Sequence, residues 1–292
     1  MGAAALRLRR LFVSDLASVA SERGAAKMKE GILLAAVGTS EPDARGAIAK
    51  IVDGVKRAFP GADVRLSLTS DAVRRAALKE EGIAFDSPPV ALAKMRDDGI
   101  SRATVQPLHV IAGEEYDRVA SVVRSLRGAG GAHAFSSLHL GAPLLETRED
   151  SGKIAALLRK EYGGLAEGRG VVVFVGHGSR ASAASAYARL QLLFDDEGLP
   201  FVIGTIRGRP GLDEVKRRLA SLKPTKVTLA PFMLVAGGHA KNDMAAPDDP
   251  GSWLSVLSKG GYSVNALLKG LGDLDGIPEL FASHIREAVR EA

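Results

Sequence analysis

The chain has 292 residues, of which 46% are hydrophobic and 25% charged, and its net charge is +5. This composition is ordinary for a globular protein, and the length suits two domains. The absence of cysteine excludes disulfides and thiolate chemistry, so any metal ion must be held by nitrogen and oxygen atoms.

Residues 1–27 are expected to be an extension that precedes the first domain. Arg9 and Arg10 stand before a short apolar run, as in a twin-arginine export signal, but Asp15 and Glu22 interrupt the apolar region that such a signal needs. Zero cysteine also fits a reducing compartment. We therefore expect the protein in the cytoplasm.

Short apolar runs alternate with helical patterns through residues 28–134, the expected first domain. Strands are predicted at 31–37, 63–68 and 103–111, and helices at 44–59, 72–80, 88–98 and 116–126. Proline and acids begin the first of these helices, and Pro60-Gly61 ends it. This alternation is typical of a parallel α/β sheet.

The same alternation continues through residues 135–292, the expected second domain. Strands are predicted at 135–140, 171–175, 201–206, 226–234 and 262–267, and helices at 153–162, 183–194, 212–219 and 278–289. The boundary near residues 128–145 follows from glycine density and from the order of the elements. No apolar run approaches the roughly 18 residues of a membrane span, so we expect no membrane association.

The stretches 105–117 and 229–241 look like two copies of one unit. At a constant offset, Pro107 falls on Pro231, Gly113 on Gly237 and Glu115 on His239. Two further features, a GTS or HGS turn and a helix with the pattern D..VRR or D.VKRR, recur in the same order in both halves. We therefore predict two similar parallel-sheet α/β domains that arose by internal duplication, with the active site in a cleft between them.

His177 and His239 are the candidate metal ligands. Each follows a buried strand and is flanked by glycine, which places it at the carboxyl edge of a sheet. Two neutral imidazoles at one site can bind a borderline divalent metal, and one of them can accept a proton near neutral pH. The alternative is that VGHGS is merely a tight strand–helix turn. The remaining histidines are expected to pack or to lie on the surface, with the first and third on strands: His109, His133, His139 and His284.

Four segments carry a resemblance to a known family: AAVGTS (35–40), QPLHVIAGEEYD (106–117), VGHGS (175–179) and LVAGGHAKNDMA (234–245). They resemble the two-domain sirohydrochlorin cobaltochelatases of the anaerobic pathway, in consistent order over about residues 29–290. The resemblance implies two ferrochelatase-like α/β domains around a cleft. It also implies that Co²⁺ is inserted into sirohydrochlorin during cobalamin synthesis, without ATP and without a further cofactor. It makes His177 and His239 the metal ligands, with His177 also the proton acceptor, and places Glu115 in the active site.

Arg207 departs from this family, which usually has a metal-binding glutamate at that position. Two unit charges 4 Å apart repel by roughly 4 kcal/mol at an effective dielectric of 20, and a dication about doubles this cost. Either Glu115 or Glu114 supplies the missing carboxylate, or the metal-bound state is weakened. Arg207 and Arg209, together with Ser179, are instead candidates for binding the carboxylates of the substrate.

Three functions are therefore compared. The first is a cobaltochelatase whose partners are sirohydrochlorin and a divalent metal, with the basic charge aiding capture of a polycarboxylate. The second is a tetrapyrrole- or metal-binding protein without turnover, and Arg207 is the residue that would indicate it. The third is a chelatase for Fe²⁺ or Ni²⁺, because imidazole sites accept several first-row ions. Nucleotide chemistry has no supporting motif, no nucleic-acid partner is expected with 5% aromatic residues, and a homo-oligomer is left open.

Overall fold

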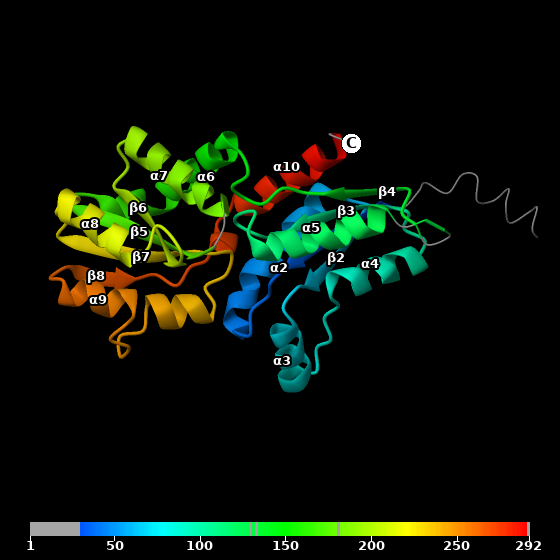
Figure 1. The fold of residues 1–292 in the computed structure, drawn as a ribbon, viewed down its shortest axis with the longest axis horizontal. Helices are drawn as coiled ribbons and strands as arrows, with labels where there is room; N and C mark the ends of the chain where they lie inside the picture. The colour runs from blue at the N-terminus through cyan, green and yellow to red at the C-terminus, as the bar shows by residue number, and fades with distance from the viewer. Residues whose placement is uncertain (1–29, 129, 132–133, 180–181, 291–292) are drawn as a thin grey trace, which may run out of the picture.

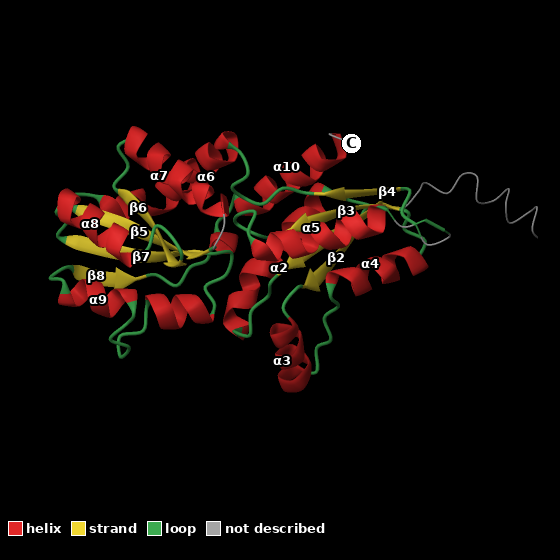
Figure 2. Ribbon diagram, viewed as in Figure 1, coloured by secondary structure: helices red, strands yellow, loops and turns green. Residues whose placement is uncertain are grey.

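The chain forms two parallel α/β halves, each around its own four-stranded sheet (Figures 1 and 2). The computed structural model describes residues 30–128, 130–131, 134–179 and 182–290. The extension expected at residues 1–27 lies outside the described residues, as does His133.

In the first sheet the strand order is β2-β1-β3-β4, and every pairing is parallel. One of its two inner strands, β1, is buried from Gly31 to Ala36, as the continuous apolar run predicts for a strand covered on both faces. The strands are β1 (Glu30–Ala36), β2 (Asp63–Leu68), β3 (Arg102–Pro107) and β4 (Ser137–Leu140). The helices in this part of the chain are η2 (Pro42–Ala44), α2 (Arg45–Ala58), α3 (Asp71–Glu81), α4 (Pro88–Asp97) and α5 (Glu114–Arg127).

The second sheet has the same arrangement, in the order β6-β5-β7-β8. Its strands are β5 (Gly170–Gly178), β6 (Phe201–Arg207), β7 (Lys226–Phe232) and β8 (Ser263–Ala266). The longer helices are α6 (Arg148–Tyr162), α7 (Ser185–Asp196), α8 (Leu212–Leu222), α9 (Trp253–Lys259) and α10 (Ile277–Arg290). The short helical turns are η3 (Gly163–Ala166), η4 (Ser182–Ala184), η6 (Leu271–Asp273) and the π-helix η5 (Ala240–Met244).

The duplication extends to a detail of the backbone. The strands expected at 103–111 and 226–234 end earlier, at Pro107 and Phe232. In both halves, backbone carbonyl groups just after this strand accept hydrogen bonds from a segment that follows the fourth strand of the same sheet. His109 and Val110 accept from Leu144 and Leu145, and Met233 and Leu234 accept from Leu271 and Gly272. His109 therefore lies after its strand rather than on it, and burial lowers its pKa to about 4.

The two halves exchange their last helices. The expected boundary between residues 134 and 135 assigns β4 to the second half, whereas its pairing with β3 places it in the first sheet. The helix α6 follows β4 but packs beside α7, and α10 follows β8 but returns to pack on α2 and the β3–β4 side of the first sheet (Figure 1). Gly54 on α2 permits this approach, because a β-carbon there would overlap Pro278 at the start of α10.

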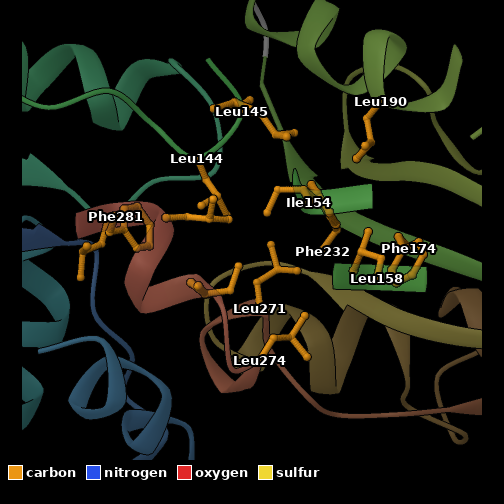
Figure 3. Close-up of a cluster of buried hydrophobic side chains, with 14 of the residues drawn as sticks. Leu144, Leu145, Ile154, Leu158, Phe174, Leu190, Phe232, Leu271, Leu274 and Phe281 are labelled. Carbon is orange, nitrogen blue, oxygen red and sulfur yellow. The ribbon is translucent and has the colours of Figure 1, made fainter. Parts of the chain in front are cut away.

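One hydrophobic core joins the halves. Its side chains come from both sheets, from α6, η6 and α10, and from the segments that connect them. Figure 3 shows that Leu144, Leu271 and Phe281 meet Ile154, Leu158 and Phe232 in this cluster. The exchanged helices therefore bury apolar surface between the halves as well as within each half.

A buried polar contact also links the exchanged helices. Nε2 of His284 on α10 lies 3.0 Å from Oδ1 of Asp150 in the first turn of α6. Asp150 also closes a capping box with Thr147. Burial alone would raise the pKa of Asp150, but hydrogen bonds from His284 and Thr147 outweigh it and lower the pKa to about 2. The ionised carboxylate is therefore the form that the fold favours.

Replacing Leu158 with alanine tests the core between the halves. Leu158 is fully buried, and we expect Leu158→Ala to lower the free energy of unfolding by about 2–5 kcal/mol. Leu192→Ala is the matched control, because that leucine is 62% exposed and should change stability by less than about 0.5 kcal/mol. Urea unfolding of both variants measures the difference, and equal losses would show that the buried cluster does not stabilise the chain.

The low pKa of Asp150 predicts a pH dependence of stability. A carboxyl group whose pKa is lowered by folding stabilises above its unfolded pKa of about 3.9, and this contribution disappears as the pH falls through the folded value. We expect wild type to lose about 2 kcal/mol relative to Asp150→Asn between about pH 5 and pH 2. A stability difference between the two proteins that does not change over this range would contradict the assignment.

Candidate active site

The two candidate histidines lie together at the carboxyl edge of the second sheet. His177 is the penultimate residue of β5, and His239 precedes the π-helix that follows β7. These strands are hydrogen-bonded neighbours, with Gly176 opposite Phe232. The ring centroids are 4.8 Å apart and the ring planes meet at 65°. The two rings are therefore adjacent, and their action as one metal site stays a prediction.

Both rings have Nδ1 engaged within the second half. Nδ1 of His239 lies 2.7 Å from Oδ2 of Asp243, which is a strong hydrogen bond with a carboxylate. Nδ1 of His177 lies 3.4 Å from the carbonyl oxygen of Gly178, a weaker contact. Neither Nε2 forms a hydrogen bond with any of the described residues. These two nitrogens are therefore the ones that a ligand can reach.

The surroundings of His177 favour its neutral form. Partial withdrawal from water lowers the pKa of His177 below its usual value, and the neighbouring His239 and Arg207 lower it further. A neutral imidazole has the lone pair that a metal ion or a proton needs. At neutral pH the His177 ring is therefore ready to act as a ligand or as a base.

Arg207 lies on the strand next to the one that carries this histidine. It ends β6 and stands opposite Gly178 in the pairing with β5. Gly178 has a positive φ of 86°, and a β-carbon there would overlap the carbonyl oxygen of Arg207, so only glycine fits. The Arg207 side chain is exposed, and in the described part of the chain no ion pair or hydrogen bond is recorded for its guanidinium.

The first half meets the site through its own turns. A β-carbon on Gly237 would lie 3.0 Å from Oγ1 of Thr39, and one on Gly113 would lie 3.3 Å from Oγ of Ser179. Lys241, two residues beyond His239, forms an ion pair with Glu41 of the first half. The glycine-flanked turns of both halves therefore pack together beside the histidine pair.

Glu115 lies on the first-half side, at the start of α5. Its Oε2 accepts a hydrogen bond of 3.2 Å from Thr69, and its Oε1 lies 2.9 Å from Nη1 of Arg118. Glu114 beside it is exposed. Within the described ranges, no third histidine or carboxylate joins the histidine pair to form a three-residue metal-binding group. Neither glutamate therefore takes the position that Arg207 leaves without a carboxylate.

Arg209 is not part of this arrangement. Its side chain is 87% exposed, and Nε lies 3.8 Å from Oε1 of Glu214. It lines an open groove of about 590 Å³ between α7 and α8 that neither histidine lines. Of the residues predicted from the sequence, His177, His239 and Arg207 are thus brought together. Ser179 lies at the junction of the halves, and Glu115 and Arg209 lie to either side.

The model of the cobalt chelatase (CbiK) family matches residues 30–290 of the chain. The chain belongs to the cobalt chelatase (CbiK) family. The sirohydrochlorin cobaltochelatase of Salmonella typhimurium is 33% identical over 266 residues, which cover 91% of this chain and 98% of that protein. The sirohydrochlorin cobaltochelatase CbiKC of Nitratidesulfovibrio vulgaris is 34% identical over 263 residues, which cover 89% and 91%.

A solved structure shows the same fold as this CbiK-family chain. SirB from Bacillus subtilis, determined with Fe³⁺, superposes with a TM-score of 0.59 over 90% of this chain and 97% of its own, at 16% identity. The predicted pair of similar parallel α/β domains of the chelatase type is confirmed. In the described residues of the chain, every helix is too short or too polar to cross a membrane.

Two features of the CbiK-family site were not predicted from the sequence. Asp243 stands four residues after His239, a spacing that brings two side chains to one face of a helical turn and could have indicated their contact. Tyr187 is buried under the β5 turn, where a β-carbon on Gly176 would lie 3.1 Å from its hydroxyl. Burial raises the pKa of Tyr187 to about 12, so it stays a neutral support for the strand that carries His177.

Arg207→Glu tests the effect of the cation on metal binding. Exchanging a cation for an anion beside a dication should strengthen Co²⁺ binding, with solvent screening limiting the gain to about 1–3 kcal/mol, or roughly 5- to 150-fold. Isothermal titration with Co²⁺ in the absence of tetrapyrrole isolates this effect from substrate binding. Arg209→Glu is the matched control and should change little. An unchanged or weaker Co²⁺ affinity in Arg207→Glu would place Arg207 outside the reach of the metal.

Proposed function

We propose that this protein inserts Co²⁺ into sirohydrochlorin, as an ATP-independent chelatase of cobalamin biosynthesis. The observation that carries the proposal is the pair His177 and His239, whose rings lie 4.8 Å apart beside the junction of the two halves. The two relatives above are named for this reaction and cover about nine tenths of the chain. The cysteine-free composition makes the cytoplasm the expected compartment.

The reaction exchanges one metal ion for two pyrrole protons. The Nε2 atoms of His177 and His239 would receive Co²⁺ and replace part of its water shell, because neutral imidazole suits divalent first-row ions. As the metal passes to the macrocycle, a histidine that releases it regains a lone pair and can accept a proton. His177 suits this exchange, because its lowered pKa keeps the ring neutral before the metal arrives.

Cations beside the pair would hold the tetrapyrrole. Sirohydrochlorin is a polycarboxylate, and the exposed guanidinium of Arg207 next to His177 is well placed to bind one of its carboxylates. Ser179 at the junction of the halves offers a hydroxyl. Arg209 would serve only a part of the substrate that extends to the α7–α8 groove. On the first-half side, Glu115 would face the macrocycle as a second proton-transfer group.

Arg207 also favours a second function, that of a protein which binds tetrapyrrole or metal without turnover. A cation beside the histidines opposes binding of a dication while it favours an anionic tetrapyrrole. An absorbance assay with sirohydrochlorin and Co²⁺, Fe²⁺ or Ni²⁺ in turn separates the candidates. A metal-dependent rate above the uncatalysed rate supports a chelatase and identifies its metal. Stoichiometric binding with no added rate supports the binding protein.

His177→Ala should abolish metallation and leave the fold intact. The residue is exposed at the end of β5, so its removal creates no cavity, while the site loses a ligand and a base. The rate of Co²⁺ insertion measures the first effect and circular dichroism the second. His139→Ala, on β4 of the first sheet, is a control histidine that should keep its activity. A near-normal rate in His177→Ala would remove the proposed role of this ring.

A further inference from the structure

Asp243 is the carboxylate most directly tied to the histidine pair. Its Oδ2 lies 2.7 Å from Nδ1 of His239, and the two side chains are similarly accessible, at 45% and 44% exposure. Asp243 also acts on the other ring, because its negative charge opposes the lowering of the His177 pKa. This carboxylate therefore affects both histidines although it follows only one of them in the chain.

The π-helix explains why Asp243 meets His239. Ala240 and Met244, four residues apart, are fully buried in the core of the second half and fix this turn against the sheet. His239 and Asp243 have the same spacing one position earlier, so they share the accessible face of the turn. π-helical turns are rare and are frequently found at functional sites. The backbone thus holds the carboxylate against one edge of the ring and leaves the other edge open.

We propose that Asp243 is a positioning residue that keeps the proton of His239 on Nδ1 and leaves Nε2 bare for the metal. A carboxylate accepts hydrogen bonds only, so it selects the tautomer that donates from Nδ1. Histidines that bind metals commonly donate their second nitrogen to such a carboxylate, which fixes the ring and makes it a stronger ligand. The inference rests on the proposed function for its metal and adds a residue to that site.

The arrangement also bears on the position occupied by Arg207. No carboxylate completes a metal-binding group with the pair among the described residues. Asp243 places a negative charge against the ring of His239, whereas Arg207 ends β6, the strand next to the one that carries His177. In this site the negative charge of Asp243 would therefore act on the metal through the ring of His239, and not as a direct ligand.

The state of the imidazole provides a test that does not depend on catalysis. Long-range ¹H–¹⁵N spectra of ¹⁵N-histidine protein at pH 8, with His239 assigned from a His239→Gln variant, report which ring nitrogen carries the proton. We expect Nδ1–H in the wild type and a mixture, or mainly Nε2–H, in Asp243→Ala and Asp243→Asn. An unchanged tautomer in both variants would overturn the proposal.

Co²⁺ titration without tetrapyrrole gives the second measurement. Loss of the partner of a metal-bound histidine typically weakens metal binding by about 10- to 100-fold, and we expect this loss in Asp243→Ala. Asp248→Asn is the matched control, because Asp248 is an exposed aspartate just beyond the same turn, and its affinity should stay within about twofold of wild type. Asp243→Asn keeps the size of the side chain, so it serves if Asp243→Ala unfolds, as a thermal melt would reveal.

The two measurements separate this inference from the proposed function. A wild type that binds Co²⁺ through His239 with Nδ1–H, but does not accelerate insertion into sirohydrochlorin, would contradict the chelatase and leave the role of Asp243 intact. If the wild type inserts Co²⁺ but Asp243→Ala binds the metal as tightly as wild type, the chelatase is supported and the role of Asp243 is contradicted.

Discussion

The parallel pairing of β5 with β7 is the constraint on which the site depends. His177 lies near the end of β5, and His239 follows β7 after a short turn, so the pairing of the two strands brings the ring centroids to 4.8 Å from each other. In this register Gly176 of β5 lies opposite Phe232 of β7. The pairing of β5 with β6 places Arg207 on the other side of β5. Three strands in fixed order thus bring two imidazoles and one guanidinium together from positions far apart in the sequence.

The exchanged helices hold the first half against this edge. Two domains in one chain usually move relative to each other unless the surface between them is large and apolar. Here α6 and α10 each leave the sheet they follow and pack on the other one, and the cluster in Figure 3 runs through both halves. Thr39 and Gly113 are therefore brought to Gly237 and Ser179 by the packing of the whole molecule. A relative movement of the halves would have to expose part of this cluster.

Much of this arrangement could be predicted from the sequence, and the failures have physical causes. Apolar runs between glycines and acids identify the strands, and the repeated turns identify the duplication and the histidine pair. The pattern of α10 shows that the helix has one apolar face but not which sheet that face covers, so its return to the first half was not predicted. The four residues of β4 likewise do not show which strand it pairs with, so its place in the first sheet was not predicted. Asp243 was not singled out because an acid four residues after a histidine is common, and this spacing indicates a contact only where the chain forms a helical turn.

The duplication provides two equivalent halves, but the charges around the histidine pair make its two members unequal. Burial and the neighbouring His239 lower the pKa of His177, and Arg207 lowers it further. His239 instead has a carboxylate, that of Asp243, 2.7 Å from its Nδ1. At the equivalent point of the first half stands Glu115, whose carboxylate contacts Thr69 and Arg118 instead of a histidine. A symmetric pair of rings would hold a dication equally from both sides. Here one ring has an anion at its Nδ1 and the other has a cation on the neighbouring strand, so the two rings are not equivalent toward a dication.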